Sequence, residues 1–86
     1  MKHFVYIIKS ISKKRYYIGY TIYIERRVKE HNAGGAKSTR PFGPWKLIYS
    51  ETFDDKSEAY KREYYLKHAK GRKEKLSLIE KYGEVT

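Results

Sequence analysis

The sequence predicts an α/β domain of the α+β type, with elements in the order β-β-α-β-α-α. Short apolar and aromatic runs indicate three strands, and helical spacing of apolar residues indicates three helices. With 86 residues and no internal repeat or linker, the chain is expected to form one domain, residues 1–86, around a single small core. In chain order, the predicted elements span residues 4–9, 15–19, 22–32, 45–52, 55–71 and 73–82.

The first two strands are predicted to form a hairpin. Residues 4–9 are apolar on both faces, which is typical of a strand buried between two layers. The connection at residues 10–14 is of hairpin size. If the turn has an even number of residues, Tyr6 and Tyr17 lie diagonally opposed on one face; an odd number places them on opposite faces.

Capping residues predict the helix boundaries. Thr21 is a plausible N-cap for the first helix, and the glycines at residues 34–35 end it. Asp55, with Glu58 at capping-box spacing, begins the second helix, and Gly71 ends it.

Helical periodicity brings three polar side chains close to the predicted core. In the first helix Ile24 and Val28 face inward, and Arg27 and His31 lie immediately beside them. Glu63 lies within about 40° of the buried stripe of the second helix. That stripe consists of Ala59, Leu66 and Ala69.

The sequence also predicts the inward face of the last helix and the two faces of the third strand. The last helix is expected to turn Leu76 and Ile79 inward. Alternation places Ile48 on one face of the third strand. The opposite face is expected to hold Trp45, Leu47 and Tyr49.

The charge indicates a polyanionic partner. Twenty Lys and Arg against ten Asp and Glu give a net charge of +10, which favours nucleic acid, above all DNA, over a membrane surface. The loop at residues 33–44 carries phosphate-binding donors, among them Ser38 and Thr39. The candidate outer nucleic-acid contacts are Lys37, Arg40, Lys70, Arg72 and Lys73, with solvated surface charge as the alternative.

Several classes of site are excluded. The chain has no cysteine, which rules out disulfides, thiolate nucleophiles and cysteine-ligated zinc, and is compatible with a cytoplasmic location. The apolar run near the N-terminus is too short for a signal-peptide core, and no longer run is present to span a bilayer.

The polar candidates suit phosphodiester hydrolysis, which needs a nucleophile, a proton acceptor, positive charge at the transition state and usually a divalent cation. Tyr6 or Tyr17 could orient or deprotonate water, provided that nearby metal or cationic charge lowers the phenol pKa. Lys9 and Arg27 are candidate sources of that charge. A single carboxylate, Glu63, suits magnesium, which keeps most of its waters.

Each candidate also has an ordinary interpretation. Either tyrosine could simply pack against a helix, and Arg27 could be a solvated helix residue like its neighbour Arg26. His31 could interact with the helix dipole. Glu63 could form a surface ion pair with the lysine at residue 67 or residue 61.

The order of these residues resembles the GIY-YIG nuclease superfamily over nearly the whole chain. The match runs through Val5-Tyr6-Ile7, Tyr17-Ile18-Gly19, the Arg27–His31 segment and the Glu63 helix, with Phe4 in place of the first glycine of the name-giving triplet. Residues 19–21, 25–32 and 57–63 look like the small stand-alone bacterial members. The asparagine found near the end of many family domains is absent.

The resemblance implies a three-stranded antiparallel sheet flanked by helices, with a concave active site on one sheet face. Tyr6 and Tyr17 would contact the attacking water, Arg27 would steady the scissile phosphate, and His31 would assist the nucleophile or leaving group. Glu63 would hold a single Mg²⁺ or Mn²⁺ ion, weakly bound without substrate. Lys9 matches a supporting lysine of some relatives.

Two functions therefore stand as hypotheses. The first is a metal-dependent endonuclease that hydrolyses DNA phosphodiesters, acting on particular DNA structures or in repair or recombination, with a protein partner supplying the targeting that small members lack. The second is a nucleic-acid-binding module with little or no nuclease activity.

Overall fold

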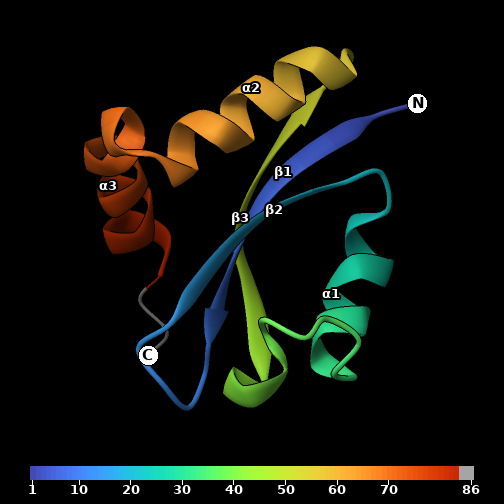
Figure 1. The fold of residues 1–86 in the computed structure, drawn as a ribbon, viewed down its shortest axis with the longest axis vertical. Helices are drawn as coiled ribbons and strands as arrows, with labels where there is room; N and C mark the ends of the chain where they lie inside the picture. The colour runs from blue at the N-terminus through green and yellow to red at the C-terminus, as the bar shows by residue number, and fades with distance from the viewer. Residues whose placement is uncertain (84–86) are drawn as a thin grey trace.

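The structure is a computed structural model that describes residues 1–83 (Figure 1). Three strands form one antiparallel sheet in the order β2-β1-β3, and α1 lies on the opposite face from α2 and α3. The predicted fold class and element order are confirmed. The elements are β1 (His3–Ser10), β2 (Tyr16–Thr21), α1 (Ile24–Asn32), the 3₁₀ helix η1 (Arg40–Phe42), β3 (Trp45–Phe53), α2 (Lys56–Lys67), the 3₁₀ helix η2 (Ala69–Gly71) and α3 (Arg72–Tyr82).

The β1–β2 hairpin has the even turn that places the two tyrosines on one face. The amide of Ser10 donates to the carbonyl of Arg15 at 3.0 Å, which leaves residues 11–14 as the connection. Tyr6 lies opposite Gly19, and Ile8 lies opposite Tyr17. Tyr6 and Tyr17 are therefore diagonal neighbours, with ring centroids 6.3 Å apart.

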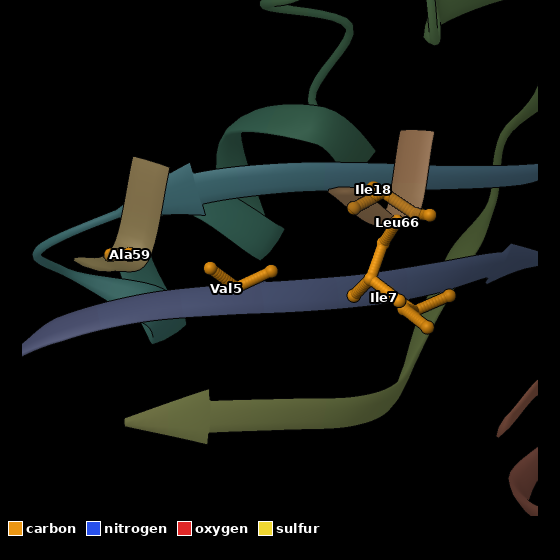
Figure 2. Packing of buried hydrophobic residues seen from close by; sticks show 5 residues of the cluster. All are labelled: Val5, Ile7, Ile18, Ala59 and Leu66. Carbon is orange, nitrogen blue, oxygen red and sulfur yellow. The ribbon is translucent and has the colours of Figure 1, made fainter. Parts of the chain in front are cut away.

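The central strand β1 is buried on both faces, as predicted. On one face Val5 and Ile7 pack with residues of β2 and α2, namely Ile18, Ala59 and Leu66 (Figure 2). On the other face Tyr6 and Ile8 pack with Trp45 and with the α1 residues Ile24 and Val28. Alternation along one strand thus separates a cluster whose buried members are all apolar from a cluster that contains the buried Tyr6.

Two predicted helix boundaries are wrong. Thr21 still pairs with Phe4 in the sheet, so it cannot cap a helix; its hydroxyl accepts the amide of Tyr23, and α1 begins at Ile24. The N-cap Asp55 is correct, because its side chain accepts the amide of Ser57 at 2.9 Å. However, α2 ends at Lys67, before Gly71.

The end of α2 could not be predicted from turn residues, because the break occurs at His68, which has an extended backbone. Ala69 therefore leaves the helical stripe and is exposed. Gly71 has a different purpose. A Cβ atom there would lie 2.0 Å from the carbonyl oxygen of Tyr65, so only glycine lets α3 begin this close to α2.

The inward faces of β3 and α3 also differ from the prediction. Ile7 lies opposite Tyr49 but Ile8 lies opposite Leu47, so a bulge at Ile48 resets the alternation of β3. As a result Trp45 and Tyr49 pack on opposite faces of the sheet. In α3, Leu78 and Ile79 pack against the core, whereas Leu76 is 50% exposed.

Candidate active site

The centre of the candidate site is a hydrogen bond between Tyr6 and His31. Tyr6 comes from the middle of β1, and His31 comes from the last turn of α1. The phenol Oη lies 2.8 Å from the imidazole Nε2, and both side chains are almost completely shielded from solvent, at 0% and 1% exposure. His31 thus points into the domain, as the helical periodicity of its segment predicted.

Thr39 holds the other nitrogen of the imidazole. Its Oγ1 lies 2.8 Å from His31 Nδ1, and the same hydroxyl donates to the carbonyl of Ala36 at 3.3 Å. A hydroxyl has one proton, so Thr39 accepts from Nδ1–H, and Nε2 is left to accept the proton of Tyr6. The expectation that Thr39 is a phosphate donor on the loop is wrong, because the residue is buried against His31.

Two contacts of β3 fix the loop that carries Thr39. The indole Nε1 of Trp45 donates to the Thr39 carbonyl at 2.9 Å. The side-chain amide of Asn32 exchanges two hydrogen bonds with the backbone of Trp45, joining the end of α1 to the start of β3. Neither contact was predicted from the sequence, because neither Trp45 nor Asn32 belongs to a recognisable motif.

The buried imidazole is neutral at neutral pH. Burial lowers the pKa of His31 below its usual value, and the charge of Arg27 lowers it further, while Glu30 acts in the opposite direction. A neutral imidazole with Nδ1 protonated is the form that accepts a hydrogen bond from Tyr6. His31 is therefore a base rather than a fixed cation.

Burial raises the pKa of the Tyr6 phenol to about 12, and the neighbouring Tyr17 raises it too, while Arg27 acts in the opposite direction. In the free protein the charge of Arg27 therefore does not outweigh burial, and the phenol pKa of Tyr6 stays above its usual value. With a proton acceptor of much lower pKa beside it, Tyr6 remains a neutral hydroxyl that donates to His31.

Gly19 makes room for the Tyr6 hydroxyl. A Cβ atom at this position would lie 2.4 Å from Tyr6 Oη, 2.6 Å from Tyr6 Cζ and 2.9 Å from Tyr17 Cε1. Real Cβ atoms do not approach other atoms this closely. The last glycine of the Tyr17-Ile18-Gly19 triplet is thus required by the packing of both tyrosines.

Tyr17 and Arg27 form the more accessible part of the cluster. The Tyr17 ring lies 4.9 Å from the His31 ring, and its side chain is only partly buried. The Arg27 guanidinium lies beside Tyr6, is 30% exposed, and has its Nη1 3.8 Å from a carboxylate oxygen of Glu30. A phosphate approaching from solvent would reach these two side chains before Tyr6.

Glu63 is connected to the cluster through Lys67, at the free edge of β2. Its helix packs on the other face of the sheet, yet Lys67 Nζ lies 5.7 Å from the centroid of the Tyr17 ring. Lys67 also pairs with the Glu63 carboxylate at 2.9 Å, and Glu63 raises the pKa of Tyr6 through its charge. The ion pair with Lys67 and proximity to the tyrosines therefore occur together.

A second ionic network fixes α2 against the rest of the domain. The guanidinium of Arg62 donates two hydrogen bonds of 2.8 Å to Glu51 on β3 and a further one to Glu74 on α3. The two carboxylates raise the pKa of Arg62. Glu51 also accepts from the phenol of Tyr49. Arg62 directly precedes Glu63, so this network anchors the helix that carries Glu63.

The remaining candidates lie away from the cluster. Lys9 is on the opposite face of β1 from Tyr6, and its Nζ donates to the Gly83 carbonyl at 2.7 Å. The guanidinium of Arg40 donates to the Gly34 carbonyl. The other outer candidates are exposed, in the loop after α1 and at the junction of α2 and α3: Lys37, Lys70, Arg72 and Lys73.

The donor set fits a cation held by one carboxylate. Residues 1–83 contain no group of three or more His, Asp or Glu side chains that could enclose a metal ion. Glu63 is 20% exposed and pairs with Lys67, which lies over the Tyr17 ring; a single carboxylate in this position suits an ion that takes its other ligands from water and phosphate. Coordination there would compete with Lys67 for the carboxylate.

The sequence profile of the GIY-YIG catalytic domain matches residues 2–77. The chain belongs to the GIY-YIG family. Its relatives include the small UPF0213 proteins of bacteria and archaea. UPF0213 protein SH2523 of Staphylococcus haemolyticus is 48% identical, over 92% of this chain and 95% of that protein. UPF0213 protein VNG_2274C of Halobacterium salinarum is 51% identical, over 86% and 97%.

A solved structure supports the fold assignment. The solution structure of the UPF0213 protein BH0048 from Bacillus halodurans is 40% identical and matches with a TM-score of 0.57, over 96% of this chain and 88% of that one. GIY-YIG membership implies a nucleic-acid substrate and nuclease chemistry, and such domains typically use a divalent metal. Within residues 1–83, no helix is long and apolar enough to cross a membrane.

Proposed function

We propose that this GIY-YIG protein is a metal-dependent endonuclease that hydrolyses DNA phosphodiester bonds. The observation that carries the proposal is the hydrogen-bonded chain Tyr6–His31–Thr39, with Arg27 and Tyr17 on its solvent side. A structural histidine needs no such partly exposed cation and phenol beside it. The site thus combines an unprotonated base, His31, with a cation that can bind phosphate, Arg27.

In this mechanism Arg27 binds the scissile phosphate and stabilises the negative charge of the transition state. Tyr17 contacts the attacking water, since it is the accessible tyrosine. Glu63 would hold the divalent ion, which supplies Lewis-acid stabilisation of the phosphate when bound.

His31 is the final acceptor of the proton released by the nucleophile. The proton passes to Tyr6 Oη while Tyr6 gives its own proton to His31 Nε2, so the phenol never has to ionise, which its raised pKa would disfavour. Movement of Arg27 onto the phosphate would uncover the Tyr6 hydroxyl, which the free protein buries.

The decisive test compares Glu63→Gln with the parent on single-stranded, duplex and branched DNA, with magnesium or manganese. We expect the variant to keep its fold and most of its DNA affinity and to lose metal-dependent cleavage, because the amide keeps the shape but not the charge. Lys61→Gln, which changes an exposed α2 residue nearby, serves as the control. Equal cleavage by Glu63→Gln and the parent would remove Glu63 from the mechanism.

One observation favours the second function, a nucleic-acid-binding module with little nuclease activity. Glu63, the carboxylate proposed to hold the metal ion, is already paired with Lys67. Absence of cleavage by the parent on every DNA form, together with salt-sensitive binding, would select this function.

The same assay on branched and damaged substrates tests structure-specific or repair activity. Restoration of activity by an added protein would show that a partner supplies targeting.

A further inference from the structure

A groove runs between β2 and α3, directly beside the candidate site. Its volume is about 390 Å³, within the range of roughly 300–1,000 Å³ typical of ligand sites. Its lining includes Lys14, Tyr16, Tyr17, Lys67, Lys75 and Leu76.

The groove combines positive charge with accessible apolar surface. Among the described residues that line it none is acidic, and Lys14 and Lys75 form no salt bridge with any residue of the 1–83 segment. Tyr16 is 41% exposed and Leu76 is 50% exposed, although helical periodicity predicted that Leu76 would be buried. A polyanion with flat apolar groups complements such a surface.

The groove is continuous with the candidate site through two shared side chains. Tyr17 lines the groove and also packs against His31. Lys67 lines the groove and also pairs with Glu63. A chain molecule lying in the groove would therefore extend to the position proposed for the scissile phosphate.

We propose that this groove binds an unpaired DNA strand adjacent to the scissile phosphate. This inference rests on the proposed function of the site. Lys14 and Lys75 bind backbone phosphates, and a base packs against Tyr16 and Leu76. Bases in a duplex are already stacked and paired, so only an unpaired base can present its face to these side chains. The preferred substrate therefore has a single-stranded segment next to the cleaved bond.

The phosphate contacts are tested by binding of a fluorescent oligothymidylate in the presence of EDTA, which prevents cleavage. Each phosphate contact to a single strand contributes about 0.7 to the slope of log affinity against log salt. The variant Lys14→Gln/Lys75→Gln should therefore lose about 1.4 of the slope and bind about 25-fold more weakly at 0.1 M salt. The control Lys29→Gln/Lys46→Gln loses the same charge from exposed positions on α1 and β3. An equal loss in both variants would overturn the proposal.

The base contact is tested with Tyr16→Ala and, because Tyr16 is in a strand, independently with Leu76→Ser on α3. Each should weaken oligothymidylate binding about tenfold, the effect of losing one stacked or packed base, and leave duplex binding unchanged. An oligonucleotide carrying 5-iodouracil should crosslink to Tyr16 on irradiation. Equal losses for single strand and duplex, or crosslinks only to residues outside the groove, would refute the base contact.

These binding readouts do not depend on cleavage. A parent that binds in the groove but never cleaves DNA would contradict the proposed endonuclease alone. A parent that cleaves DNA while the groove variants bind as tightly as it does would contradict the groove alone.

Discussion

Replacing Gly19 with alanine should break the candidate site without removing any functional group. The added Cβ would lie 2.4 Å from Tyr6 Oη, whereas comfortable contacts need about 3.5 Å, so the phenol must move by about 1 Å. Gly19 has no positive φ, so alanine meets no backbone strain there. The whole effect therefore comes from displacement of the Tyr6 ring and, to a smaller extent, of the Tyr17 ring.

The displacement has two measurable consequences. The Tyr6–His31 hydrogen bond of 2.8 Å would lengthen beyond the useful range of about 3.2 Å, and a misplacement of about 1 Å costs roughly 100-fold in rate. Overpacking in a core typically costs about 1–3 kcal/mol, which is a fall in Tm of about 5–20 °C for a domain of this size.

The assay combines thermal unfolding, the ¹⁵N chemical shifts of the His31 ring and DNA cleavage. Gly43→Ala is the matched control, since a Cβ there meets Trp45 at ordinary contact distances of 3.8 and 4.0 Å. A Gly19→Ala variant with unchanged His31 shifts and the cleavage rate of the parent would refute the reasoning.

Three further predictions concern the core of the site and its support. Tyr6→Phe should destabilise the protein by about 1–3 kcal/mol in urea titrations, because it leaves buried His31 Nε2 without a donor, whereas Tyr17→Phe should not. Because the pKa of His31 is lowered in the folded state, the unfolded chain binds more protons than the folded one. The free energy of unfolding should therefore fall as the pH drops from about 7 through the folded pKa. His31→Gln should remove this pH dependence. If the slope of the free energy of unfolding against pH persisted in His31→Gln, it would come from other groups. Arg62→Ala should cost about 2 kcal/mol by leaving two carboxylates unpaired, while Arg26→Ala, at an exposed 3.8 Å ion pair, should cost under about 0.5 kcal/mol; equal losses would contradict this.

Local pattern was enough to predict the elements and their order, because strand alternation and helical periodicity are clear along most of the chain, whereas the arrangement of the sheet followed from the family resemblance. It also placed Arg27 and His31 correctly, since Ile24 and Val28 define the buried arc of α1. Sequence reasoning left the face of Tyr17 open, because the parity of the hairpin turn cannot be counted from residue types.

The errors share one physical origin, which is contact between distant segments. The bulge at Ile48 and the break at His68 have no local turn signal. Thr39 looked like a solvent-facing loop residue, and only the approach of the loop to α1 makes it the partner of His31. Burial of Tyr6 by distant segments likewise outweighs the effect of Arg27 on the pKa of its phenol.

The central position of β1 in the sheet also divides the site by mobility. Tyr6 lies on a strand that is hydrogen-bonded on both sides, and its partner His31 is buried, so we expect the slowest amide exchange around this pair. Tyr17 lies on an edge strand, and Glu63 reaches the site from a separate helix. When DNA binds, β2 and α2 would therefore move, while the proton acceptor His31 remains fixed.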